Sequence, residues 1–244
     1  MGLTVEVGHL ADMMAHDPAG AEWALADFEA INEALQAKSL TAHEEPAKGE
    51  PWSADMFGYA SLSALREVAA LTWAGLSIPH DRLIDGEETD QSDALVADFL
   101  EHLSGSAQLT LLGRALRNFF KAKEPPKKPP FLHLIMHSDH DGYYVPVAFE
   151  TPIVAKRVTD ETEHLWPLGS VFGLEAEVNR LANILELPIE MTHQDKALLA
   201  FLEAPATASD AALWQAQPLA AHACALLRDA CHQSLTTGAA IRFC

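Results

Sequence analysis

Apolar residues recur at the spacing of an α-helix in several stretches of this 244-residue chain. Asp17 stands before one stretch as a possible N-cap, Pro18 suits its first helical position, and Ser170 can cap a later stretch in the same way. The apolar stripes are Ala24, Phe28, Ile31 and Leu35; Leu62, Leu65, Ala69 and Thr72; and Leu174, Val178, Leu181 and Leu185. The pattern therefore predicts several amphipathic helices that pack against a shared core.

Short alternating stretches predict strands at both ends of the chain, LTVEVG at residues 3–8 and AAIRFC at residues 239–244. The stretch HLIMHSDHDGYYVPVAF, residues 133–149, predicts a β-hairpin with SDHDG as its turn, since Gly142 tolerates a positive φ. Pro146 cannot donate a ladder hydrogen bond, which indicates that the second arm lies at a sheet edge or ends at this residue. The predicted class is α+β, with several amphipathic helices packed on a small, mostly antiparallel sheet that has a central β-hairpin.

The composition favours a packed core, because 49% of the residues are hydrophobic. We expect a single globular α+β domain over residues 1–244, with a Pro/Lys-rich loop, KEPPKKPP, at about 121–130. Polar, proline-containing stretches predict loops at 41–55 and about 150–168, and helical patterns predict further helices at about 92–103 and 106–121. The start of the chain lacks a secretory signal pattern and no run of 18 apolar residues occurs, so a cytoplasmic protein is expected.

The formal net charge of −19 is the strongest global constraint on partners. Nucleic acid and membrane are not expected as partners, because phosphate binding depends on lysine and arginine. The charge is uneven: six of the sixteen basic residues fall within 114–128, and eight acidic residues fall within 81–101. Such a distribution favours a basic protein as partner, since charge complementarity speeds association. The oligomeric state stays open.

The cluster HSDHD could bind a divalent metal such as zinc. Its candidate ligands are His137, Asp139, His140 and Asp141. In a strand, His133 and His137 would lie about 13 Å apart, which is too far for one metal ion. Ordinary turn chemistry also explains the aspartates, since Asp side chains accept bonds from nearby backbone N–H groups. Metal binding is therefore the alternative, and no cofactor is the main expectation.

Aromatic and acidic residues in the predicted loops and hairpin are candidates for a partner-binding surface. Tyrosine and tryptophan dominate binding hot spots, and acidic loops would steer a basic partner toward them. The candidates are Tyr143, Tyr144, Trp52, Trp166, Glu44, Glu45, Asp85, Glu87, Glu88 and Asp90.

Three segments, LTVEVGHLADMMAHDPAGAEW, HSDHDGYYVPVAF and GSVFGLEAEVNRLANIL, carry a resemblance to a set of bacterial α+β proteins of similar length. Some of these look like immunity proteins, which neutralise a toxin delivered by neighbouring cells. The resemblance implies no catalytic residues, and the chain contains no G-x-S-x-G or phosphate-binding glycine motif.

The sequence thus predicts an acidic, non-enzymatic binding protein, of immunity type, whose partner is a toxin with a basic surface. A metal-dependent hydrolase or metal-binding protein that uses the cluster 137–141 is the alternative.

Overall fold

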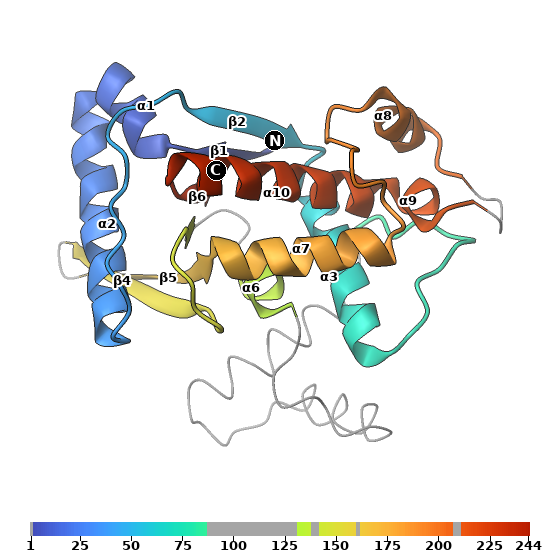
Figure 1. The fold of residues 1–244 in the computed structure, drawn as a ribbon, viewed down its shortest axis with the longest axis horizontal. Coiled ribbons are helices and arrows are strands. Elements are labelled where there is room, and N and C mark those ends of the chain that lie inside the picture. The colour runs from blue at the N-terminus through green and yellow to red at the C-terminus, as the bar shows by residue number, and fades with distance from the viewer. Residues whose placement is uncertain (1, 87–130, 138–141, 160–161, 207–210) are drawn as a thin grey trace.

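The computed structural model describes residues 2–86, 131–137, 142–159, 162–206 and 211–244. A six-stranded mixed sheet with the order β2-β1-β6-β3-β5-β4 lies at the centre of the fold (Figure 1). Only β3 and β5 pair in parallel, and the other neighbours are antiparallel. The strands are β1 (Leu3–Val7), β2 (Trp52–Met56), β3 (Tyr143–Val145), β4 (Ile153–Thr159), β5 (Thr162–Ser170) and β6 (Ile241–Phe243).

Helices account for most of the rest of the described chain. The long helices α2, α3 and α7 match the three apolar stripes of the sequence, and a fourth long helix, α10, begins at Pro218. The helices are α1 (His9–His16), α2 (Pro18–Ala37), α3 (Tyr59–Ala74), α6 (Leu132–Ile135), α7 (Val171–Ile184), α8 (Lys196–Glu203), α9 (Leu213–Ala216) and α10 (Pro218–Thr237). The predicted α+β class with a mostly antiparallel sheet is confirmed.

The sheet separates two apolar cores. Helices α1 and α2 pack on one face, whereas α3, α7 and α10 cover the other (Figure 1). Strand β3 shows the division most clearly, because Tyr143 and Val145 belong to the α2 side and Tyr144 to the α10 side. This alternation is that of a strand buried on both faces. Helix α2 is therefore a separate outer layer, with one side on the sheet and the other in solvent.

Two predicted helix caps are present. The Asp17 side chain accepts a hydrogen bond from the backbone N–H of Gly20 at 3.1 Å, and the Ser170 hydroxyl accepts one from Gly173 at 3.3 Å. Each cap satisfies a backbone donor that the first turn of a helix leaves unpaired. The terminal strands were also predicted at the right places.

The predicted hairpin at 133–149 is wrong in its first arm. Residues 132–135 form helix α6 instead of a strand, and the predicted turn residues 138–141 lie outside the described part. The second arm, β3, is an interior strand between β6 and β5, so of the two positions that Pro146 allowed, the sheet edge is wrong and the end of the strand is confirmed. Pro146 follows the last residue of β3 and therefore removes no hydrogen bond from it.

Two predicted loops contain strands. Strand β2 begins within 41–55, ends at Met56 and pairs with β1. Strands β4 and β5 form a hairpin that covers most of 150–168 and ends at Ser170. The helices predicted at about 92–103 and 106–121 and the loop at about 121–130 fall outside the described residues. Within the described ranges, no helix is both long enough and apolar enough to cross a membrane.

Candidate partner-binding surface

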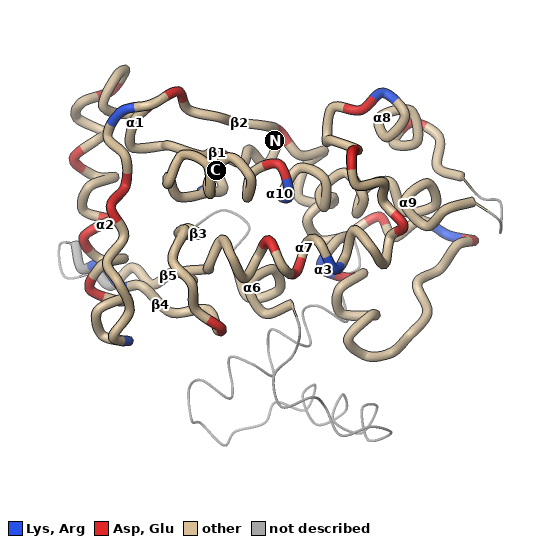
Figure 2. The backbone as a smooth tube through the Cα atoms, viewed as in Figure 1, with Lys and Arg blue, Asp and Glu red and all other residues tan. Residues whose placement is uncertain are grey.

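Acidic residues gather on the outer layer formed by α1, α2 and the connection from α2 to β2. Residues 1–37 contain seven acidic residues and no lysine or arginine. Figure 2 shows aspartates and glutamates in the middle part of α2, and both acidic and basic residues in the connection that returns beside it. Helices α1 and α2 therefore present a negative surface without a lysine or arginine, whereas the connection also exposes Lys38 and Lys48.

The solvent side of α2 carries a row of glutamates. Glu22, Glu29 and Glu33 are exposed and stand seven and four residues apart, which places them on one face of the helix. At 1.5 Å per residue the row extends about 16 Å along the helix axis. We call these three residues the α2 acidic row. Their carboxylates point into solvent from a helix whose opposite side is fixed to the sheet.

Asp27, the remaining acid of α2, points inward and has a structural role. Its carboxylate accepts a hydrogen bond from the Tyr143 hydroxyl at 3.0 Å and forms an ion pair with Arg157 of β4. Burial raises the pKa of Tyr143, and the charge of Asp27 raises it further, so the phenol stays protonated and can donate. Asp27 thus holds the helix on the sheet and does not belong to the exposed row.

The connection between α2 and β2 lies against α2 and exposes charges of both signs, Glu44 and Glu50 with Lys38 and Lys48. The Asn32 side chain donates to the His43 carbonyl at 2.9 Å and accepts from the His43 N–H at 2.7 Å. The buried Glu45 carboxylate, 2.7 Å from the His43 ring, also accepts the N–H of Ala240 at 2.8 Å. These bonds fix the connection, which then presents Glu44 and Glu50 to solvent.

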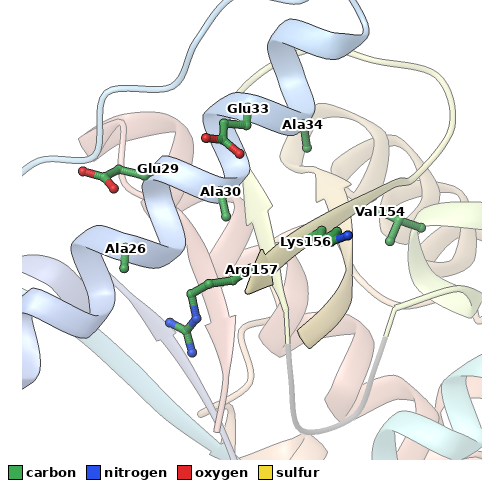
Figure 3. Close-up of a pocket in the computed structure, with 8 residues that line it drawn as sticks. All are labelled: Ala26, Glu29, Ala30, Glu33, Ala34, Val154, Lys156 and Arg157. Atoms are coloured by element: carbon green, nitrogen blue, oxygen red, sulfur yellow. The ribbon is translucent and has the colours of Figure 1, made fainter. Parts of the chain in front are cut away.

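A groove of about 540 Å³ runs between α2 and β4. Three alanines of α2 point toward the strand, and Glu29 and Glu33 lie on the outer rim, with Arg157 reaching from the strand end of the groove (Figure 3). The lining residues are Ala26, Glu29, Ala30, Glu33, Ala34, Val154, Lys156 and Arg157. The acidic row therefore borders a shallow depression with an apolar floor.

The aromatic residues predicted as exposed anchors lie elsewhere. Tyr143 and Tyr144 are buried, and the Tyr144 hydroxyl donates to the His133 carbonyl at 2.8 Å. Trp166 is buried in β5, and Trp52 is half-buried in β2 against His193. The prediction that the tyrosines and Trp166 are exposed is wrong. The cause is that β3 and β5 are interior strands, whose side chains enter both cores.

The predicted acidic candidates are divided between surface and interior. Glu44 and Asp85 are exposed, but the Glu45 side chain is buried in its contact with His43. Residues Glu87, Glu88 and Asp90 lie outside the described part of the chain. The structure therefore brings Glu44, but neither Asp85 nor Glu45, to the surface beside α2.

The candidate metal cluster is only partly described. His137 is buried, and its ring stacks on Tyr144 with the centroids 4.0 Å apart and an angle of 11° between the planes. Asp139, His140 and Asp141 lie outside the described residues. In the ranges that the structure describes, no group of three or more His, Cys, Asp or Glu side chains is placed to hold a metal ion.

A family model described as "Putative DNA-mimic protein" matches residues 1–243. The chain belongs to this family. Comparison with curated proteins and with solved structures gave no match. Membership of the family agrees with the coarser part of the sequence prediction, an acidic protein that binds another protein. Toxin neutralisation stays a prediction.

Sequence reasoning missed the α2 acidic row, which is the main feature of the surface. The signal was present, because Glu22, Glu29 and Glu33 follow a helical spacing within a segment that has no lysine or arginine. These glutamates lie opposite the apolar stripe that predicts the helix. A helix face whose exposed charges all have one sign differs from the mixture of both signs that is typical of soluble surfaces.

Proposed function

We propose that this protein is a DNA mimic that occupies the DNA-binding surface of a partner protein through the negative layer of α2. The observation that carries the proposal is the α2 acidic row on a 37-residue segment without lysine or arginine. The match to a family described as DNA-mimic proteins supports it independently. In this role the protein competes with DNA for the partner and makes no contact with DNA itself.

The dimensions of α2 suit this role. A helix of 20 residues is about 30 Å long, which is the length of about nine base-pair steps at 3.4 Å each. The row supplies three carboxylates over about half of that length. Glu44 and Glu50 of the neighbouring connection are also exposed, but Lys38 and Lys48 balance their charge. A DNA strand carries more phosphates over this length than the row carries carboxylates. The carboxylates stand on a rigid helix, which loses little conformational freedom on binding.

The partner is a protein whose DNA-binding face is basic. Lysine and arginine side chains that neutralise DNA phosphates would meet the carboxylates of the row in the same way, with charge-assisted hydrogen bonds. Binding should then weaken steeply as salt rises, because both association and affinity depend on screened charge. A toxin that acts on DNA would be one such partner, and toxin neutralisation remains a prediction within this proposal.

Affinity capture with a DNA elution step tests the proposal. The full chain is immobilised, exposed to an extract of the source cell and washed, and bound proteins are eluted with duplex DNA. We expect the eluted proteins to be DNA-binding proteins. If duplex DNA elutes nothing, and retained proteins leave only with high salt or denaturant, the chain does not occupy a DNA-binding surface.

Two charge variants make the experiment specific. The row variant, Glu22→Gln with Glu29→Gln and Glu33→Gln, removes the acidic row. The matched variant, Asp81→Asn with Glu190→Gln and Glu203→Gln, removes three exposed charges at the end of the molecule away from α2 (Figure 1). We expect the row variant to lose most of the DNA-eluted proteins and the matched variant to keep them. If both variants lose the DNA-eluted proteins to the same extent, binding depends on the net charge of the chain and not on the position of the row.

A further inference from the structure

Trp23 is a large apolar side chain left in solvent beside the acidic row. All five tryptophans lie in the described part of the chain, and Trp23, at 62% exposed, is the only one that is mostly in solvent. It follows Glu22 directly in α2 and lies on the side of the helix that faces the groove. Tryptophan is enriched among the residues that contribute most to binding, so an exposed tryptophan beside a charged row is a candidate anchor.

Contacts with Arg157 hold Trp23 in a defined position. The guanidinium carbon of Arg157 lies 5.5 Å from the centroid of the Trp23 ring and 6.0 Å from that of Trp166, so it sits between the two rings. Its Nη1 also donates to the Trp23 carbonyl at 3.4 Å and pairs with Asp27. The exposed indole is therefore already ordered, which lowers the entropy that it loses when a partner covers it.

The surroundings of the exposed indole favour a cation. The charge of Arg157 is offset by Asp27, and Glu22 stands next to Trp23 without a basic residue in the same helix. Arginine matches such a pair best, because its planar guanidinium stacks on an aromatic face and binds a carboxylate with two parallel hydrogen bonds. Lysine offers a compact charge that does neither as well. DNA-binding faces are rich in arginine, which is the commonest reader of guanine.

We propose that Trp23 and Glu22 form the anchor site for one arginine side chain of the basic partner. The guanidinium stacks on the exposed part of the indole and pairs with the Glu22 carboxylate, and the rest of the row attracts the neighbouring basic residues. The inference rests on the proposed function for the identity of the partner. The anchor site goes beyond the proposed function in one respect. Binding depends on the aromatic contact with Trp23 as well as on charge, and this contact selects arginine over lysine.

Two synthetic peptides test the anchor without knowledge of the natural partner. Both are helix-forming 12-residue peptides without aromatic residues and with equal charge, one with four arginines and the other with four lysines. Their dissociation constants for the full chain are measured by calorimetry at low salt. We expect the arginine peptide to bind at least five-fold more tightly than the lysine peptide, and Trp23→Ala to reduce this ratio to about one.

Further variants separate the anchor from general electrostatics. Trp23→Phe should keep part of the arginine preference, and Phe172→Ala, which removes an exposed aromatic residue of α7, should keep all of it. Glu29→Gln with Glu33→Gln should weaken the binding of both peptides and leave the ratio of their dissociation constants unchanged. A Trp23→Ala protein that still prefers arginine as strongly as the native chain would overturn the proposal. Failure of the proposed function would appear separately, as a lack of DNA elution in the capture experiment.

Discussion

The Asp27 carboxylate accepts a hydrogen bond from the Tyr143 hydroxyl at 3.0 Å, which ties the middle of α2 to the central strand β3. The same carboxylate pairs with Arg157, the residue that orders Trp23. One helix therefore carries two kinds of acid. Asp27 keeps α2 in place, and the α2 acidic row faces the solvent.

Replacement of the two kinds of acid should change the stability of the fold by different amounts. Asp27→Asn removes a charge from a half-buried network and should lower the free energy of unfolding by about 1–3 kcal/mol. Glu29→Gln on the same helix should change it by less than about 0.5 kcal/mol, because its side chain is exposed. Urea unfolding of the two variants checks the difference. Equal effects would mean that Asp27 is not a structural tie.

Glu177 of α7 gives a pH-dependent prediction. Its carboxylate accepts the backbone N–H groups of His133 and Leu134 at 3.0 and 2.8 Å, at the start of α6. Burial raises the pKa of Glu177 from 4.5 to about 8. Between these values the unfolded chain has released the proton and the folded chain still holds it. The free energy of unfolding should therefore fall as pH rises, by up to about 1.4 kcal/mol per pH unit.

The contribution of Glu177 is measured as a difference between proteins. Urea unfolding is recorded from pH 5 to pH 8 for the native chain, for Glu177→Gln and for the exposed control Glu190→Gln. The slope should be shallower in Glu177→Gln alone, since glutamine does not titrate. A native slope that survives in Glu177→Gln would assign the pH dependence to other groups.

The helices could be predicted from sequence because their signals are local. The stripe from Ala24 to Leu35 defines the buried side of α2, and Asp17 and Ser170 form the caps that their positions predict. Such signals depend on residues within one or two turns. Helices with such local signals can therefore be predicted without knowledge of the tertiary fold.

Helix α6 could not be predicted because its decisive contact is distant in sequence. Its short apolar run fits a strand as well as a helix, since periodicity does not distinguish them over a few residues. The contact that favours the helix comes from Glu177, 44 residues beyond His133. The β4–β5 hairpin was missed for a different reason. Ile153 and Ala155 of β4 are buried and Val154 between them is exposed, which is the alternation of a strand. Prolines and charged residues on either side of this short stretch indicate a loop instead.

The metal alternative gives a prediction that does not depend on the partner. The His137 ring packs between Tyr144 and Phe243, with its centroid 5.0 Å from that of Phe243, so coordination would require it to leave these aromatic contacts. We therefore expect protein purified without a histidine tag to contain no stoichiometric zinc, and chelation to leave its melting temperature unchanged. Elemental analysis showing one zinc per chain, with a lower melting temperature after chelation, would establish the alternative instead.

The central claim is that the α2 acidic row replaces DNA on a basic partner surface. The most direct measurement is a displacement titration, in which a fluorescent 20-base-pair duplex is bound to a purified protein obtained by DNA elution. The native chain should release the duplex completely, and the row variant should need at least ten-fold more protein for half-release. The matched variant should behave like the native chain.

One result would contradict the account most plainly. If the native chain and the duplex bind the same partner together, the fluorescence anisotropy of the duplex will stay high or rise as the chain is added. Equal release by the native chain and the row variant would likewise show that the row is not the contact surface. Full release by the native chain with loss of potency in the row variant alone is the outcome that the structure predicts.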